Sequence, residues 1–432
     1  MLSRVSFFAV HCVAHVCLYL VPRCLFYILV KLPITLIEQQ LGEQRSFPEN
    51  DFLMEVVTNW WDKSTLRFFG IVERGMEYPR PLYGGHMQTL MGAMLRRVPK
   101  ATYRRVVVTA DDSNPICLDW SLAKVAEGQQ ARGVLLVLPG LGSSSASSYI
   151  HHFAVDANRE GFHCCVMNTR GMGDTPVTAP RLMSAVFTAD VRAILRNGLL
   201  LTAAVDAGVL ESSELPLQAV GFSLGGVILT NYLYEESIKQ RNDASSGLRI
   251  VKAGLHRMLS VGHAESSIYL TRPAQMMLYQ RALTRGLREY VFRHRKVVEQ
   301  MPEIPSNLLA AGGRMERVST VQEFDSLFIV PHFGFKCRED YYTAATVTDG
   351  KLEHVAIPMM CIGAQDDPIV GPPPHLRRWE RIAQTNKNIV FVGLPAGGHL
   401  GFLGNPLDEL SGATQASHLL LLHAARNVVS EN

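Results

Sequence analysis

Between residues 133 and 237 the chain repeats one pattern, a short apolar segment followed by a longer segment of helical composition. The apolar segments are GVLLVLPG (133–140), HCCVMNTRG (163–171) and LPLQAVGFS (215–223), each of a length typical of a strand. Strands that are apolar on both faces are typical of a parallel sheet, because crossover helices shield both of its faces. This alternation constrains the architecture more than any other feature and predicts an α/β fold.

Further segments extend the pattern on both sides. Residues 103–120 predict a hairpin with DDSNP as its turn. Two more apolar strands are expected at residues 357–364 and 388–395. Helices are expected over residues 147–162, 184–205, 225–237 and 413–429.

The alternation stops between about residues 262 and 348, where helical, basic stretches such as RALTRGLREYVFRHRKVVEQ occur. A helical piece between sheet strands predicts a cap inserted into the α/β core. The expected parts of the chain are an N-terminal membrane anchor (1–35), an N-terminal extension (36–100), the first part of the core (101–261), the helical cap (262–348) and the second part of the core (349–432).

The first thirty residues carry a long apolar run. Residues 5–22 are broken only by His11 and His15, and the region up to residue 30 is long enough for a bilayer-spanning helix. A cleaved signal peptide has a shorter apolar region and small residues at its cleavage site. An apolar helix packed on the core is the other alternative. We expect a single-pass anchor in an endomembrane; basic residues at both ends leave its orientation open.

Charge and cysteine content exclude other classes of protein. The net charge of +3 is too small to indicate nucleic-acid binding. The 8 cysteines form no CxxC pair and no cluster with histidines at metal-ligand spacing. We therefore expect no nucleic-acid partner, no disulfide framework and no metal site, while the oligomeric state stays open.

The third apolar segment ends in GFSLGG, which matches the pattern G-x-S-x-G at Gly221, Ser223 and Gly225. In this pattern a strand turns sharply into a helix and exposes the serine, and the glycines leave room for the turn. The segment follows an apolar strand and precedes an apolar helix, as the pattern requires. We expect Ser223 to be a nucleophile; the alternative is a helix N-cap.

A serine nucleophile needs a base, and the base needs an acid that orients it. His399 follows an apolar strand in the glycine-rich segment LPAGGHLGFL and is the expected base. CIGAQDDPIV places Asp366 and Asp367 after the preceding strand. We favour Asp367 as the acid and keep Asp366 in reserve. The order Ser, Asp, His agrees with the G-x-S-x-G pattern.

Acyl transfer also needs donors for the oxyanion. The backbone N–H of Leu224, directly after the nucleophile, is one expected donor. The other is the N–H of Leu141, in the loop LPGLGSSSASS that follows the first apolar strand. The serines at 143–148 are interpreted as loop and helix-cap residues.

With these residues in place, the chain resembles the α/β-hydrolase-domain (ABHD) lipases and esterases, in the branch with an N-terminal anchor and an HMQT-type motif. The resemblance runs from about residue 78 to 402. Its matching segments are GGHMQTL (84–90), LDW (118–120), NTRGMGD (168–174), GFSLGG (221–226), VQEFDSLF (321–328), GFKCREDYY (334–342), AQDDPIV (364–370) and GGHLGF (397–402).

The resemblance implies an α/β-hydrolase fold and a catalytic triad of Ser223, Asp367 and His399, because the second aspartate of the DDP turn is the family's usual acid. Family activities include hydrolysis of monoacylglycerols, short-chain esters and phospholipids. The loop PGLGSSS departs from the His-Gly of many relatives; the donor there is a backbone N–H, so this change leaves the chemistry intact. His86 and Gln88 belong to the HMQT motif, for which we expect a structural role.

Two further features of the sequence have a structural interpretation as well as a functional one. His151 and Asp156 match the H-x-x-x-x-D spacing of some acyltransferases, but the segment also reads as the helix after the oxyanion loop. The basic run of the cap could face anionic lipid headgroups, although such a run is more often a solvated helix face. Its residues are Arg281, Arg285, Arg288, Arg293, Arg295 and Lys296.

The sequence therefore predicts a membrane-anchored α/β-hydrolase, with a mostly parallel sheet flanked by helices, an inserted cap and an N-terminal hydrophobic helix. We expect it to hydrolyse carboxylic esters, either acylglycerols, phospholipids or small esters, through an acyl-enzyme and without a metal or organic cofactor. Two alternatives stay open, a lipid transacylase and a non-catalytic ligand-binding protein on the same scaffold.

Overall fold

A computed structural model describes much of the chain. The described residues are 55–57, 84–94, 98, 100–126, 128–242, 252–256, 279–364, 366–370, 381–382, 384–394, 396–403, 417–418, 421–422 and 425–426. The predicted anchor, residues 1–35, lies outside them. Within these ranges, no helix combines the length and the apolar character needed to cross a bilayer.

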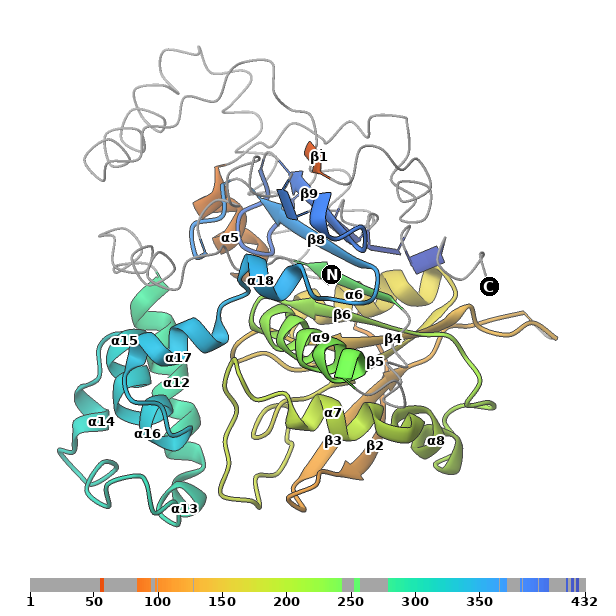
Figure 1. The fold of residues 1–432 in the computed structure, drawn as a ribbon. Coiled ribbons are helices and arrows are strands. Elements are labelled where there is room, and N and C mark those ends of the chain that lie inside the picture. The colour runs from red at the N-terminus through yellow and green to blue at the C-terminus, as the bar shows by residue number, and fades with distance from the viewer. Residues whose placement is uncertain are drawn as a thin grey trace, which may run out of the picture.

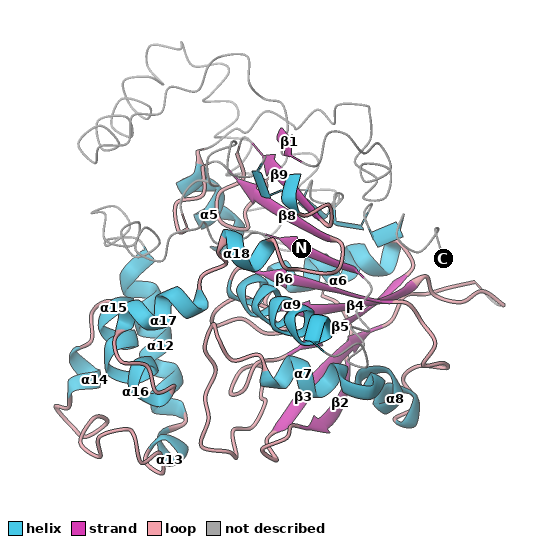
Figure 2. Ribbon diagram, in the orientation of Figure 1, coloured by secondary structure: helices cyan, strands magenta, loops and turns pink. Residues whose placement is uncertain are grey.

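The described strands form one nine-stranded sheet at the centre of the molecule (Figures 1 and 2). In spatial order the strands are β1 (Glu55–Val57), β9 (Ile389–Leu394), β8 (Met359–Ala364), β7 (Lys252–His256), β6 (Leu217–Phe222), β4 (Gly133–Leu138), β5 (Phe162–Met167), β3 (Pro115–Ser121) and β2 (Arg104–Thr109). The six strands from β9 to β5 run parallel, and β1, β3 and β2 pair antiparallel at the two sides. The structure thus confirms the predicted mostly parallel sheet and the β2–β3 hairpin.

The central strands are buried on both faces. In β4, Val134 and Leu136 belong to one apolar core, whereas Leu135 and Val137 belong to the other. Successive side chains of a strand point to opposite faces, so this division means that helices cover both faces of the sheet. A continuous apolar run was therefore the correct signal for a central strand.

Different helices build the two cores. Helices α7 (Ala189–Leu195), α8 (Leu199–Asp206) and α9 (Leu224–Asn242) supply residues to the core that contains Val134. Helix α6 (Ser148–Arg159) and the C-terminal segment supply the other core. Figure 1 shows α9 in front of the sheet and α6 behind it.

The expected single helix over residues 184–205 is wrong. The chain forms α7 and α8 instead, separated at Asn197 and Gly198, whose φ angles are 54° and 71°. These angles lie in the left-handed region, which ends a right-handed helix and which asparagine and glycine adopt at the least cost. The Asn-Gly pair was the sequence signal for this break.

A helical cap lies between β7 and β8 and forms a lobe beside the sheet (Figure 1). The described elements of the lobe are α12 (Arg281–Arg293), α13 (Arg295–Val298), α14 (Arg314–Arg317), α15 (Val321–Phe324), the π-helical turn η4 (Asp325–Ile329), α16 (Val330–His332) and α17 (Arg338–Ala345). The next helix, α18 (Asp349–Leu352), lies against α9 (Figure 1). The expected start of the cap, at residue 262, lies outside the described residues.

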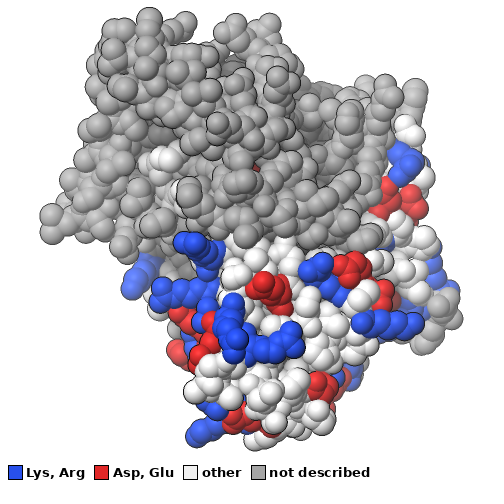
Figure 3. Space-filling model, turned by 90° about the vertical axis from the view of Figure 1, so that its left-hand side faces the viewer, with Lys and Arg blue, Asp and Glu red and all other residues white. Residues whose placement is uncertain are grey.

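The basic run of the cap has acidic neighbours. Arg285 pairs with Glu289 at 2.7 Å, and Arg295 pairs with Glu299 at 2.5 Å, each four residues apart on a helix. In Figure 3, which faces this side of the molecule, acidic and basic side chains are interspersed among uncharged ones. These contacts favour the solvated-face interpretation over a uniformly cationic surface.

A buried arginine ties the NTRGMGD segment to the rest of the core. The side chain of Arg170 is 2% exposed and makes two bonds to Asp112, at 2.5 and 2.9 Å, and two to Asp190, at 2.6 and 2.8 Å. The backbone carbonyl of Arg170 accepts a hydrogen bond from Tyr290 of the cap at 2.7 Å. This segment therefore connects the hairpin, α7 and the cap.

Removing this guanidinium should destabilise the fold severely. We expect Arg170→Ala to lower the free energy of unfolding by about 3–5 kcal/mol, because Asp190 would stay buried without its cation. Urea denaturation measures the change. The control is Arg196→Ala, since the Arg196–Asp111 pair is exposed and should contribute under about 1 kcal/mol. Equal losses in both variants would contradict a special role for the buried pair.

Candidate active site

Ser223 lies at the junction of β6 and α9, where the backbone turns sharply. Its φ is 52°, in the left-handed region that non-glycine residues seldom adopt. A Cβ at Gly225 would lie 2.1 Å from the carbonyl oxygen of Leu138, and a Cβ at Gly221 would lie 2.5 Å from the Cα of Gly226. The glycines are thus required for close packing, and the strained turn exposes the serine at the carboxyl end of the sheet.

His399 reaches Ser223 from the loop after β9. Its Nε2 lies 3.0 Å from Ser223 Oγ, across 176 residues of sequence. Its side chain is 10% exposed, so one edge of the imidazole still meets solvent. The contact is a hydrogen bond when the Ser223 hydroxyl donates to an unprotonated Nε2.

Asp367, and not Asp366, contacts this imidazole. The Oδ2 of Asp367 lies 2.9 Å from His399 Nδ1, and its side chain is fully buried. The Oδ1 of the same carboxylate accepts hydrogen bonds from the N–H groups of Ile369 and Val370, at 2.9 and 3.0 Å. These bonds fix the carboxylate, which in turn favours the His399 tautomer that has its proton on Nδ1.

Asp366 holds the histidine loop instead. Its Oδ1 accepts the N–H groups of Gly397 and Gly398, each at 2.9 Å. Burial raises the pKa of Asp366 to about 6, against the opposing effect of these two donors. The two adjacent aspartates therefore contact the same loop: Asp366 accepts hydrogen bonds from its backbone, and Asp367 contacts the His399 imidazole.

Helix α5 (Gly85–Met94) supports the histidine loop through two side chains. Thr89 Oγ1 accepts the backbone N–H of His399 at 2.8 Å and donates to the carbonyl of Gly85 at 2.7 Å. Gln88 is fully buried, and its Oε1 accepts the N–H of Leu403 at 2.8 Å. The structural role expected for Gln88 is in line with this contact; the part played by Thr89 was not foreseen.

The same helix also contacts the cap. His86 Nδ1 lies 2.9 Å from the hydroxyl of Tyr279, and the two rings stack with their centroids 5.7 Å apart. Burial lowers the pKa of His86, while the nearby carboxylate of Asp367 raises it. Helix α5 thus joins the edge of the cap to the loop that carries His399.

Close packing of α5 gives a stability prediction with a built-in control. A Cβ at Gly85 would lie 1.7 Å from the carbonyl oxygen of Asp366, whereas a Cβ at Gly84 would meet nothing within 4 Å. We expect Gly85→Ala to cost about 1–3 kcal/mol of unfolding free energy, because helix and loop must move apart. Gly84→Ala should stay within about 0.5 kcal/mol of the parent in urea denaturation. A stable Gly85→Ala protein would show that α5 does not pack there.

The loop after β4 lies directly beside Ser223. A Cβ at Gly140 would be 3.2 Å from the Cβ of Ser223, and the N–H of Gly140 donates to the Tyr149 hydroxyl at 2.8 Å. Leu141 follows in this loop, and Leu224 is the first residue of α9. Among the hydrogen bonds of the described residues, none uses the N–H of Leu141 or Leu224. Leu224 is therefore next to the serine in the chain, and Leu141 follows the glycine that packs against Ser223. The contact between Gly140 and Tyr149 was not anticipated.

A buried polar network holds this loop in place. Asp119 Oδ2 accepts hydrogen bonds from the Ser145 hydroxyl at 2.5 Å and from Asn168 Nδ2 at 2.7 Å. Asn168 Oδ1 also accepts the backbone N–H of Ser145 at 2.9 Å. Arg105 bonds to both carboxylate oxygens of Asp119, at 2.7 and 2.8 Å. Asp119 of the LDW segment and Asn168 of the NTRGMGD segment therefore both hydrogen-bond to Ser145 and hold the loop beside Ser223 in position.

The arrangement supports nucleophilic acyl chemistry. Ser223, His399 and Asp367 form a continuous chain of contacts in which a base can take a proton from the hydroxyl and an acid can stabilise the resulting imidazolium. One group of three possible metal ligands occurs among the described residues, and it consists of other side chains: His152, Asp156 and His418.

Comparison with known proteins relates the chain to a family of hydrolases. A model of the alpha/beta hydrolase family matches residues 134–413. The embryogenesis-associated protein EMB8 of Picea glauca is 30% identical over 74% of this chain and 65% of its own length. Phospholipase ABHD3 of Mus musculus is 29% identical over 73% of this chain and 70% of its own.

A third relative is the monoacylglycerol lipase of Saccharomyces cerevisiae, which is 27% identical over 63% of this chain and 55% of its own length. The matches with the Picea glauca and Saccharomyces cerevisiae proteins thus cover less than two thirds of those relatives.

Proposed function

The chain belongs to the alpha/beta hydrolase family, and on this basis we propose that it is a serine hydrolase that cleaves carboxylic esters of acyl lipids. The observation that carries the proposal is the position of the His399 imidazole, 3.0 Å from Ser223 Oγ on one side and 2.9 Å from Asp367 Oδ2 on the other. A serine in a strained strand-to-helix turn beside a base and a buried acid is the constellation that acyl transfer requires.

In this mechanism Ser223 Oγ attacks the ester carbonyl carbon while His399 Nε2 takes the hydroxyl proton. Asp367 keeps the imidazole oriented and stabilises its charged form. His399 then gives the proton to the departing alcohol, which leaves an acyl group on Ser223. Water attacks this acyl-enzyme with His399 again as base, and the acid product leaves as the serine regains its proton.

The negative charge that develops on the carbonyl oxygen needs donors fixed before the reaction. We assign this role to the backbone N–H groups of Leu141 and Leu224. The tight approach of Gly140 to Ser223 supports the assignment, because it brings the loop of Leu141 against the nucleophile. The Asp119–Ser145–Asn168 network keeps this loop from moving when the charge forms.

Acyl lipids are the proposed substrates, either acylglycerols or phospholipids. Two of the relatives carry the names phospholipase and monoacylglycerol lipase. The cap next to the sheet is consistent with a site that shields an acyl chain from water, which strengthens the electrostatic contacts within it (Figure 1).

The test combines an activity-based probe with a substrate panel. The folded wild-type protein should react with a fluorophosphonate and release fatty acid from at least one of a monoacylglycerol, a phosphatidylcholine and a short-chain p-nitrophenyl ester. Added glycerol separates hydrolase from transacylase: free acid as the main product supports hydrolysis, and acylated glycerol as the main product identifies a transacylase. Folded protein that reacts with neither probe nor panel would contradict the proposal and favour a ligand-binding scaffold.

Residues 1–35 supply the proposed membrane anchor. The support is the apolar run of residues 5–30, which is long enough for a bilayer span. The full chain should stay in the membrane fraction after extraction at alkaline pH, and a version that begins at residue 36 should be released from it. If the full chain is also released under these conditions, the segment does not anchor the protein in the bilayer. That result would favour the alternative of an apolar helix packed on the core.

A further inference from the structure

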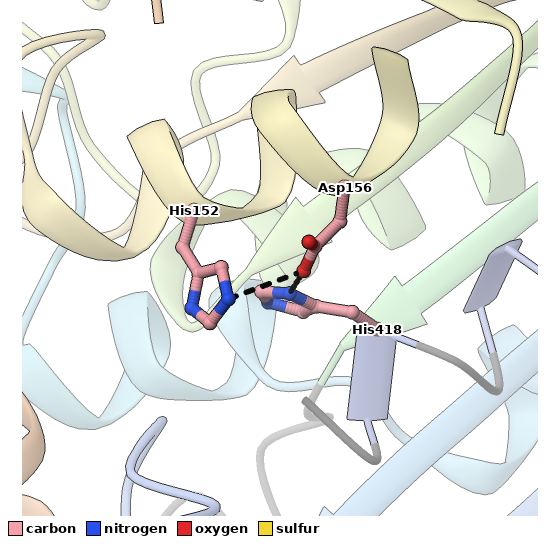
Figure 4. A group of neighbouring side chains, drawn as sticks. All are labelled: His152, Asp156 and His418. Carbon is pink, nitrogen blue, oxygen red and sulfur yellow. Dashed lines mark hydrogen bonds and ion pairs between the residues drawn. The ribbon is translucent and has the colours of Figure 1, made fainter. Parts of the chain in front are cut away.

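A second cluster of titratable side chains lies between α6 and the C-terminal segment, on the face of the sheet opposite α9 (Figures 1 and 4). His152 and Asp156 are one helical turn apart on α6, and His418 comes from the short described stretch 417–418. Their side chains are 3%, 0% and 1% exposed. Three groups that prefer water are therefore held together in an apolar core, and this requires a physical explanation.

The ligand atoms of the three side chains are close enough together that they could hold one metal ion. His418 Nδ1 lies 2.9 Å from Asp156 Oδ2, and His152 Nε2 lies 3.3 Å from the same oxygen. The three ligand atoms all lie within 4.8 Å of one another. Ligands at 2.0–2.2 Å from a zinc ion are themselves about 3.0–3.5 Å apart, so both separations from the carboxylate fit a shared cation. Figure 4 shows both imidazoles directed at one carboxylate oxygen.

The surroundings fix the positions of the three side chains. Arg159 Nη1 lies 3.2 Å from Asp156 Oδ1, so the two imidazoles face the other carboxylate oxygen, Oδ2. The ring of His418 packs edge-on against Phe153 at 5.2 Å and Phe222 at 6.4 Å. Aromatic walls fix the imidazole and keep water away from the ligands, as the outer layer of a metal site does.

We propose that His152, Asp156 and His418 bind a transition metal ion, with zinc as the best match to two imidazole nitrogens and one carboxylate oxygen. In the bound form, His152 Nε2 and His418 Nδ1 each offer a lone pair, so each ring carries its proton on the other nitrogen. The ion links α6 to the C-terminal segment behind β6, the strand that leads to Ser223. Its role is structural, and it takes no part in the proposed ester chemistry.

Neither motif spacing nor the acyltransferase pattern indicated this site. His418 follows Asp156 by 262 residues, so the third ligand could not be found by local spacing. In the H-x-x-x-x-D match, His151 accepts the N–H of Ala101 at 3.1 Å, while Asp156 faces the two other histidines. No metal site was expected from the sequence, because the chain has no CxxC pair and no Cys/His cluster at metal-ligand spacing.

Metal titration of the full chain tests the proposal. Protein stripped with a chelator should bind one equivalent of Zn²⁺ in isothermal titration, and Co²⁺ should produce visible absorption bands of a nitrogen- and oxygen-ligated ion. His418→Asn and Asp156→Asn should each weaken zinc binding by tenfold or more. The control is His151→Asn, since His151 is adjacent on α6 but faces the backbone of Ala101; it should bind like the parent.

Thermal unfolding gives a second readout that does not depend on a stable variant. Zinc at a hundredfold excess over its Kd should raise the Tm of the wild-type protein by roughly 3 °C, and the shift should be absent in His418→Asn. The proposal would be overturned if folded wild-type protein does not bind zinc, shows no zinc-dependent shift in Tm and gives no cobalt absorption. The three side chains would then be a hydrogen-bonded cluster without a metal. Fluorophosphonate labelling of the same stripped sample reports on Ser223 separately, so the two proposals fail independently.

Discussion

Replacing Ser223 with alanine should abolish labelling by a fluorophosphonate and lower kcat for ester hydrolysis by roughly 10⁴- to 10⁶-fold. The reason is that Ser223 Oγ is the hydroxyl that lies 3.0 Å from His399 Nε2, and among the described residues no other side chain is hydrogen-bonded to that nitrogen. Residual turnover would come from substrate binding and the oxyanion donors, which the change leaves in place. Gel fluorescence measures the labelling, and steady-state kinetics on the best substrate of the panel measures kcat.

The control for this experiment is Ser212→Ala. Ser212 lies in the loop before β6, and its hydroxyl contacts only the N–H of Glu214 among the described hydrogen bonds. This variant should label and turn over like the parent. Labelling that persists in Ser223→Ala would place the reactive serine elsewhere and remove the basis of the proposed mechanism.

Asp367→Asn should have the second largest effect, a decrease in kcat of about 10⁴-fold with little change in the fold. The asparagine side chain has nearly the same shape, but its amide can donate to His399 Nδ1. Nδ1 would then accept, Nε2 would carry the proton, and the imidazole could no longer take one from Ser223. Kinetics of the purified variant, with circular dichroism to verify folding, measure the loss.

Asp366→Asn is the matched control, because it makes the same change one residue away. The amide oxygen can still accept the N–H groups of Gly397 and Gly398, so kcat should fall by less than about tenfold. If the two variants lose activity equally, or if Asp366→Asn loses more, the assignment of the acid is wrong.

The carboxyl group of Asp366 also makes the stability of the fold depend on pH. The pKa of Asp366 is raised to about 6 by burial, above its usual 3.8. Between these two pH values the folded state holds a proton that the unfolded chain has released, so the free energy of unfolding should decrease as the pH rises from about 4 to 6. Asp366→Asn should remove this component, which urea denaturation at pH 4, 5, 6 and 7 can resolve.

Much of the architecture follows from patterns that a local stretch of sequence can express. The apolar runs at β4, β5 and β6 predicted the central parallel strands, because burial on both faces leaves no polar alternation. G-x-S-x-G predicted the tight strand-to-helix turn at Ser223, since the glycines are needed where a Cβ would meet Leu138. The break between α7 and α8 also has a local signal, the Asn197-Gly198 pair, but the expected single helix over residues 184–205 did not take it into account.

By itself, the sequence determined which residue types stand at the ends of the strands, and hence the order of serine, aspartate and histidine. Only the tertiary structure decided which of two adjacent aspartates faces His399, because that depends on how the turn after β8 meets the loop after β9. The support from Thr89 and the meeting of His152, Asp156 and His418 were likewise decided there. Contacts between segments hundreds of residues apart depend on how helices and loops pack on the sheet, and spacing along the chain does not encode that packing.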